Sequence, residues 1–100
     1  MEALAALADP TRIRIVEELA IRPLTANEVV GLFSISQPSV SRHLRILREA
    51  GLVSAQPIGR QRLYHLDPKP LAEIDIWLAG FRKFWSDKLD ALEIQMDEGN

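Results

Sequence analysis

Apolar residues recur with helical spacing in the first half of the chain, and capping residues mark where the helices begin. A short helix is expected before Asp9, and Asp9-Pro10 is typical of the start of the next one. Asp accepts hydrogen bonds from free N–H groups there, and Pro has no N–H to satisfy. The apolar stripe that follows consists of Ile13, Val16, Leu19 and Ala20 and is closed by Pro23.

Two further helices are predicted close together. Thr25-Ala26-Asn27-Glu28 has the form of a capping box and opens a short helix that ends near Ser34. Ser36 then caps another helix, which has Pro38 in its first turn, runs to Glu49 or Ala50 and stops at Gly51. Two helices separated by about three residues predict a helix-turn-helix over residues 25–50.

The spacing changes after Gly51. Residues 52–56 and 62–66 have the pattern of two short strands, and residues 57–61 are expected to connect them. This hairpin, the predicted wing, covers residues 52–66, and a final helix is expected over residues 70–97. The sequence therefore predicts one domain over residues 1–100, mainly α with a small β-hairpin.

The final helix has the pattern of a dimerisation element. A continuous helix over residues 70–97 would be about 42 Å long, which is longer than the core of a domain of this size can cover. Its apolar steps of three and four residues approach a coiled-coil seam that ends at Met96. A homodimer is therefore expected, although the helix folding back on its own wing is an alternative. The predicted dimerisation residues are Leu4, Leu7, Leu78, Phe81, Trp85, Leu89 and Leu92.

Charge is distributed unevenly, and this changes the interpretation of a net charge of −2. Residues 34–66 carry five arginines against the single acid Glu49, whereas both flanks are acidic. Arginine without lysine suits phosphate and guanine recognition. The chain has no Cys, no signal-peptide pattern and no apolar run that could span a membrane. A cytoplasmic protein is expected.

The basic residues fall mainly on the second helix of the predicted helix-turn-helix. Val40, Leu44 and Leu47 form its apolar stripe, so its other side is polar. Residues near the start of such a helix reach base edges, those further along meet phosphates, and a wing arginine can enter the minor groove. The alternatives are an ordinary amphipathic surface helix and a winged-helix adaptor for protein contacts. The predicted DNA-binding residues are Gln37, Ser39, Ser41, Arg42, Arg45, Arg60 and Arg62.

Three blocks carry a resemblance to a known family. They are Ala8-Asp9-Pro10-Thr11-Arg12, Ser36-Gln37-Pro38-Ser39-Val40-Ser41-Arg42-His43-Leu44 and Leu47-Arg48-Glu49-Ala50-Gly51-Leu52-Val53. In order and spacing the chain resembles the ArsR/SmtB family of bacterial winged helix-turn-helix repressors. The tail with Trp77 and Trp85 looks most like the branch of the sporulation-delay autorepressors. The resemblance implies a homodimeric repressor on a pseudo-palindromic double-stranded DNA operator.

The chain departs from the family's metal-sensing pattern. Residues 25–31, which correspond to the Cys-Val-Cys type motif, contain no thiol, and the last helix has Asp75 but no His. No metal site and no cofactor are therefore expected, and the sequence names no inducer. His43 is expected to be packed and His65 to lie at the base of the wing. Ser39 and His43 stand at i and i+4, but a nucleophile and base also need an orienting group and a pocket, so no enzyme is expected.

Overall fold

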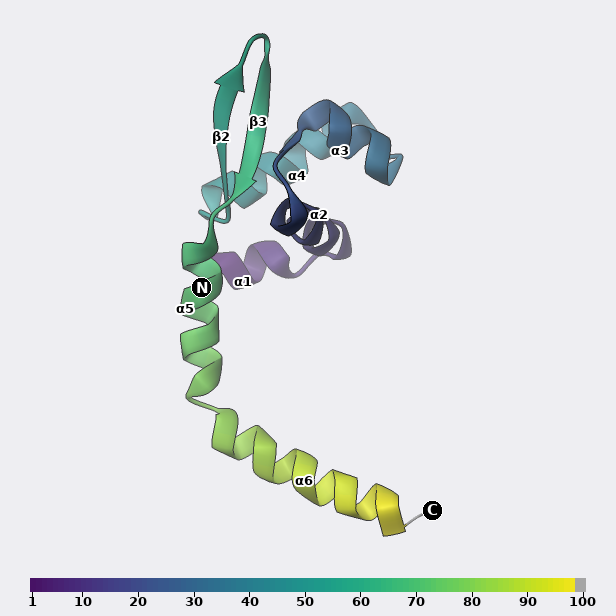
Figure 1. The fold of residues 1–100 in the computed structure, drawn as a ribbon, viewed down its shortest axis with the longest axis vertical. Helices are drawn as coiled ribbons and strands as arrows, with labels where there is room; N and C mark the ends of the chain where they lie inside the picture. The colour runs from purple at the N-terminus through teal and green to yellow at the C-terminus, as the bar shows by residue number, and fades with distance from the viewer. Residues whose placement is uncertain (99–100) are drawn as a thin grey trace.

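The structure is a computed structural model that describes the backbone of residues 1–98 and the side chains of residues 1–92. Figure 1 shows a compact body from which two helices extend. The body contains α1 (Glu2–Leu7), α2 (Pro10–Ile21), β1 (Leu24–Thr25), α3 (Ala26–Phe33), α4 (Gln37–Glu49), β2 (Val53–Ile58) and β3 (Gln61–Leu66). The extension consists of α5 (Pro68–Ala79) and α6 (Arg82–Glu98). No helix among the described residues is both long and apolar enough to cross a membrane.

The predicted helix starts are confirmed by their hydrogen bonds. The Asp9 carboxylate accepts from the backbone N–H groups of Thr11 (2.8 Å) and Arg12 (3.1 Å). The Thr25 hydroxyl accepts from the backbone N–H of Glu28, whose carboxylate accepts in turn from the N–H of Thr25, so the capping box is complete. These side chains satisfy backbone donors that have no partner within their own helix.

The predicted apolar stripe of α2 is wrong at two positions. The buried residues are Ile15, Val16 and Leu19, whereas Ile13 is 43% exposed and Ala20 is also exposed. The two stripes differ by a small rotation of the helix, and both fit its spacing. Contacts of α2 with α4 and β3 decide between them, and those contacts are distant in sequence.

A three-stranded antiparallel sheet with the order β1-β3-β2 replaces the expected two-stranded hairpin. The unpredicted strand β1 pairs Leu24 with Tyr64, and Leu24 is almost fully buried. The connection within the hairpin is also shorter than predicted, because Pro57 pairs with Arg62 and the ladder continues to the turn. Only Gly59 and Arg60 remain unpaired, and Gly59 has a φ of +59°, which glycine adopts without strain.

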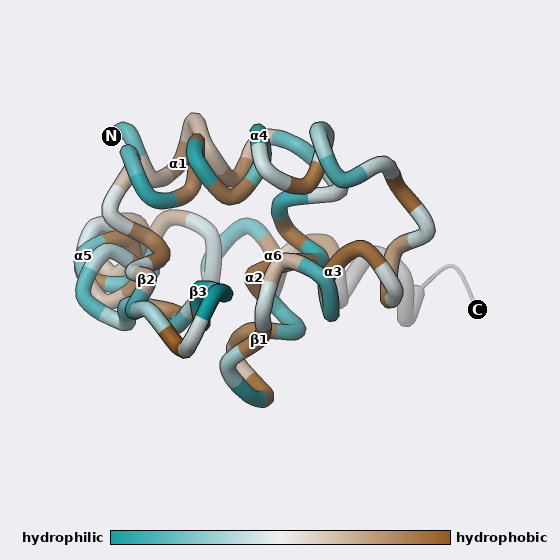
Figure 2. Tube along the Cα trace, turned by 90° about the horizontal axis from the view of Figure 1, so that it is seen from above, coloured by the Kyte–Doolittle hydropathy of each residue, from teal (hydrophilic) through white to brown (hydrophobic). Residues whose placement is uncertain are grey.

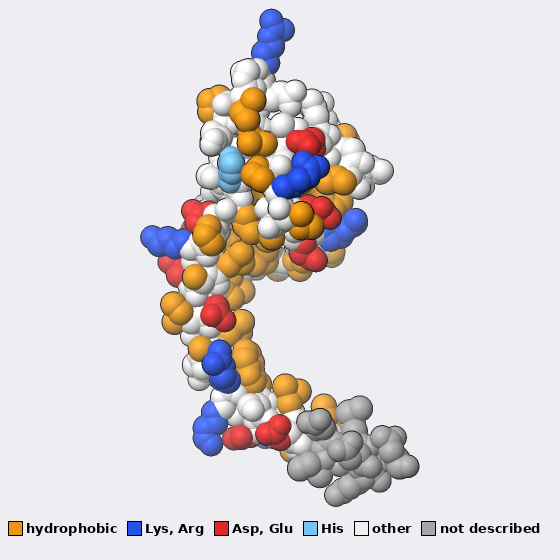
Figure 3. Space-filling model, viewed as in Figure 1, with side chains coloured by type: hydrophobic (Ala, Val, Ile, Leu, Met, Phe, Trp, Pro, Cys, Tyr) orange, Lys and Arg blue, Asp and Glu red, His pale blue; other side chains and the backbone are white. Residues whose placement is uncertain are grey.

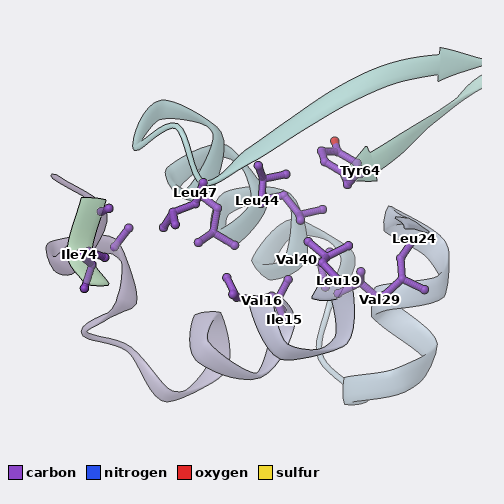
Figure 4. Close-up of a cluster of buried hydrophobic side chains, with 14 residues drawn as sticks. Ile15, Val16, Leu19, Leu24, Val29, Val40, Leu44, Leu47, Tyr64 and Ile74 are labelled. Atoms are coloured by element: carbon purple, nitrogen blue, oxygen red, sulfur yellow. The ribbon is translucent and has the colours of Figure 1, made fainter. Parts of the chain in front are cut away.

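The core lies between α2, α4 and the sheet. Figure 4 shows apolar side chains from these elements meeting in one cluster, with Tyr64 at one edge and Ile74 of α5 at the other. Hydrophobic and hydrophilic segments alternate along α1 and α4 in Figure 2, as expected of helices that bury one side. The fully buried side chains are Ile15, Leu24, Val29, Val40, Leu44, Leu47 and Leu52.

The predicted single helix over residues 70–97 is wrong, because the chain bends between α5 and α6. The N–H groups of Gly80 and Phe81 bond to carbonyls three residues earlier, so α5 ends in a tight turn. Gly80 stands at this end and favours helix least of all residues except Pro. The molecule measures 59 × 28 × 20 Å, and α6 points away from the body (Figure 1). The side chain of Met96, the last predicted seam position, lies outside the described side chains.

Candidate nucleic-acid interface

The helix-turn-helix is formed by α3 and α4 with a connection of three residues, as predicted. Ser34 ends α3 in the left-handed conformation, with φ 53° and ψ 37°, which turns the chain sharply. Ser36 then begins α4 by accepting from the backbone N–H of Ser39 at 3.2 Å. These two serines set the direction in which α4 follows α3.

One side of α4 is buried and the other is cationic. Val40, Leu44 and Leu47 are buried as predicted, and His43 joins them at 9% exposure. The opposite side is exposed and presents Ser41, Arg42, Arg45 and Arg48. The apolar contacts therefore orient the helix so that its arginines face outward.

The exposed side of α4 borders an open groove of about 610 Å³ that reaches to the hairpin. No carboxylate lines this groove, and none of its arginines forms a salt bridge among the described residues. It brings together predicted residues from two parts of the chain, because Arg62 of β3 faces the arginines of α4. The lining residues are Pro38, Ser41, Arg42, Arg45, Arg48, Arg62 and Tyr64.

A second groove of about 300 Å³ lies between the start of α3, the start of α4 and the wing. Its lining residues are Ala26, Asn27, Gln37, Arg60, Gln61, Arg62 and Tyr64. Arg62 and Tyr64 line both grooves and so mark the boundary between them. Gln37 lies on the wing side of that boundary, apart from Ser41 and Arg42.

Among the predicted DNA-binding residues, Ser39 alone lines neither groove. Ser39 is half-buried, and its hydroxyl accepts a hydrogen bond from the Ser36 hydroxyl at 3.0 Å. Its i, i+4 neighbour His43 lies beside Arg12, with 3.3 Å between Nδ1 and the guanidinium Nη1. Ser39 and His43 are thus held by different partners.

Arg12 is a residue that the sequence analysis did not assign to the site. Its Nε donates to the carbonyl of Ala6 at the end of α1, and its Nη1 reaches His43 on α4. The backbone N–H groups of Arg12 and Thr11 hold the pKa of Asp9 below its usual value, and the Arg12 charge acts in the same direction. Arg12 therefore links α1, α2 and α4. Its place in the Asp-Pro-Thr-Arg block was the available signal.

An ion pair fixes the start of α3. Arg22 donates to Glu28 at 2.9 Å, and Glu28 completes the capping box with Thr25. The pKa of Glu28 is lowered mainly by the hydrogen bond from the Thr25 backbone N–H, and also by the hydrogen bond from Arg22. The end of α2 and the start of α3 are thereby joined beside the second groove.

The predicted dimerisation residues fall into two groups. Leu4, Leu7 and Leu78 are partly buried against the core of their own chain. The predicted residues that lie on α6 or in the turn before it are exposed, with Phe81 at 45% and Trp85 at 37%. Leu89 and Leu92 are more than half exposed, and Figure 3 shows apolar side chains along the stem that leads to this helix.

Within the described residues there is no group of three His, Cys, Asp or Glu side chains that could hold a metal ion. His65 lies on β3 opposite Ser54, as expected for the base of the wing. Its Nε2 is buried and has no hydrogen-bond partner in the described part of the chain.

Comparison with known proteins identifies the family. The family model "Bacterial regulatory protein, arsR family" matches residues 9–55, which span α2, the helix-turn-helix and the start of the wing. The HTH-type transcriptional regulator Rv2034 of Mycobacterium tuberculosis is 44% identical over 84 residues, which cover 84% of this chain and 76% of that protein. The chain belongs to the ArsR family. This ArsR-family chain is thus a DNA-binding transcriptional regulator and not an enzyme.

Two further matches extend over most of this chain and most of the relative. The transcriptional repressor SdpR of Bacillus subtilis is 36% identical over 76% of this ArsR-family chain and 84% of SdpR. A crystal structure described as a possible transcriptional regulator for arsenical resistance is 41% identical, with a TM-score of 0.76. The match covers 95% of this chain and 96% of the chain in that crystal structure. The winged helix-turn-helix prediction is confirmed.

Proposed function

We propose that the chain is a cytoplasmic homodimeric repressor that binds a pseudo-palindromic operator. The observation that carries the proposal is the continuous cationic face that α4 and the wing form around Arg62. In a winged helix-turn-helix, one helix enters the major groove and the hairpin reaches the adjacent minor groove. Repression is supported by SdpR, a transcriptional repressor and a relative of similar length.

The residues of the cationic face divide by their position along α4. Ser41 and Arg42 lie about one turn from the start of the helix, where side chains reach base edges. Arg45 and Arg48 lie further along and are placed for phosphates. Arg60 stands in the turn at the tip of the hairpin, where Figure 3 shows a cationic side chain projecting from the body. We assign it to the minor groove.

The overall charge of −2 does not oppose DNA binding, because the charges are segregated. Carboxylates are absent from the residues that line either groove. No arginine of the face forms a salt bridge among the described residues. These arginines are therefore available to phosphates.

A second copy of the chain is the proposed partner of the C-terminal extension. Trp77, Phe81, Phe84, Leu89 and Leu92 each expose 45% or more of their surface. Side chains of this size dominate the energetics of stable interfaces. A dimer of this kind would carry two copies of α4, and helix-turn-helix dimers bind two half-sites about 34 Å apart.

The proposal is tested with DNA from upstream of the chain's own gene. The purified protein should retain one fragment at a salt concentration that releases random duplex of the same length. Specific binding is typically at least about a thousandfold tighter than non-specific binding. Weak binding of all fragments alike, erased by moderate salt, would contradict a sequence-specific regulator.

A further inference from the structure

Tyr64 is a core residue whose polar end is directed out of the core. Its side chain is only 9% exposed, and Leu24 and Ala55 flank it on the neighbouring strands. Figure 4 shows its oxygen pointing away from the packed apolar side chains. Within the described part of the chain, the hydroxyl has no hydrogen-bond partner. It lines both grooves of the cationic face.

Tyr64 lies at the boundary between the groove beside α4 and the groove beside the wing. One groove is bordered by α4 and the other by the wing, and Arg62 and Tyr64 are the two residues common to both. If α4 lies in the major groove and the wing tip in the adjacent minor groove, one sugar-phosphate strand must pass between them. The boundary that this strand crosses is formed by Arg62 and Tyr64.

We infer that the Tyr64 hydroxyl and the Asn27 amide hold one phosphate of this strand beside Arg62. A phenol O–H and an amide N–H₂ donate to phosphate oxygens, and the guanidinium supplies charge. Asn27, in the first turn of α3, lines the second groove together with Arg62 and Tyr64. The inference rests on the proposed docking of α4 and the wing, and it adds two uncharged contacts that fix the register of the duplex.

Tyr64→Phe isolates the hydroxyl, because the buried ring is retained. We expect this variant to bind both operator and random duplex roughly ten- to a hundredfold more weakly per subunit, since each subunit loses a hydrogen bond to a charged group. Its salt dependence should equal that of the wild type, because no cation is removed. Arg62→Gln should instead lower the slope of log affinity against log salt by about 0.9 per subunit. Fluorescence anisotropy at three salt concentrations measures both quantities.

The contact is located by replacing single phosphates of the operator duplex with uncharged methylphosphonates. Wild-type protein should lose affinity at one position between the half-site's major groove and the adjacent minor groove. Tyr64→Phe and Asn27→Ala should each lose less there than the wild type. Gln56→Ala serves as the control, since Gln56 is exposed on the same hairpin but lines neither groove. It should reproduce the wild-type pattern.

Each outcome separates the inference from the proposed function. Wild-type binding to its operator with an unchanged affinity for Tyr64→Phe overturns the inference alone. A methylphosphonate pattern in Tyr64→Phe identical to that of the wild type does the same. Failure of the wild type to prefer any duplex overturns the proposed function as well. Asn27 is exposed on α3, so its variant tests the same phosphate without touching the core.

Discussion

Arg42 and Arg60 should have separable roles, with Arg42 contributing to sequence recognition and Arg60 to general affinity. Arg42 borders the groove beside α4, and Arg60 borders the groove beside the wing. Both side chains are exposed, so neither alanine variant should unfold the domain. Arg42→Ala should cost roughly 1–3 kcal/mol on the operator and flatten the preference at one or two base pairs.

The magnitude for Arg60 follows from the number of arginines around the two grooves. Apart from Arg42, which is assigned to bases, Arg45, Arg48, Arg60 and Arg62 contribute four per subunit, and a dimer has twice that number. If each displaces the counterion of one phosphate, the slope of log affinity against log salt approaches about −7. Arg60→Ala removes two of these contacts from the dimer and lowers the magnitude of the slope by about 1.8. A fourfold rise in salt concentration should therefore reduce the ratio of wild-type to variant affinity by roughly tenfold.

The assay compares operator, single-base variants of the operator and random duplex at three salt concentrations. Arg60→Ala should weaken all of them by similar factors, because the minor groove carries little sequence information. Equal weakening of every duplex by Arg42→Ala would refute the assignment of Arg42. It would then be a phosphate contact, and base recognition would have to come from Ser41 or Gln37.

Three further predictions concern assembly and stability. Replacing both Phe81 and Trp85 with Glu should yield monomers with reduced operator affinity, and a dimer that persists in sedimentation would contradict the proposed interface. Leu47 is fully buried, so Leu47→Ala should lower the free energy of unfolding by about 2–5 kcal/mol in urea titrations; a loss below 1 kcal/mol would argue against the packing of α4. Asp9 has a pKa below 3.8 in the folded state, so its stabilising effect is present above that pH and is lost as the pH falls through the lower folded value. Thermal unfolding between pH 5 and 2 should therefore show a smaller loss of stability for Asp9→Asn than for the wild type, and parallel curves would contradict the capping role.

Local signals in the sequence were sufficient for the starts of the helices. Asp9, Thr25 and Ser36 each accept from a backbone N–H two or three residues later, so the relevant partner lies within the same short segment. The two short helices of the helix-turn-helix followed from these caps. The alternation of apolar and polar residues in the two wing strands is also a local signal, although the strand pairing extends further toward Gly59 than predicted.

Contacts distant in sequence account for most of the errors. The pairing of Leu24 with Tyr64 joins segments 40 residues apart, and two residues are too few to show a strand pattern. The bridge from Arg12 to His43 spans 31 residues. Gly80 is different, because its low helix propensity was visible in the sequence. The regular apolar spacing on both sides favoured one helix, and that spacing does not reveal a bend.

The candidate site was predicted better in its charges than in its geometry. The five arginines of the basic segment line the two grooves that α4 and the wing form. The division of those grooves by Arg62 and Tyr64 was not predictable, because β3 had to be placed against α4 first. The sequence around Asn27 indicates only a capping box, and its place beside the wing depends on the same packing.

The central claim, a dimer that places two recognition helices on one operator, is tested most directly by footprinting the bound DNA. Hydroxyl-radical cleavage of the upstream fragment should show two protected segments related by two-fold symmetry. Their centres should lie about 34 Å apart, or a multiple of one helical turn, with two chains bound per operator. A single protected segment with one chain bound, or uniform protection along the fragment, would contradict the claim.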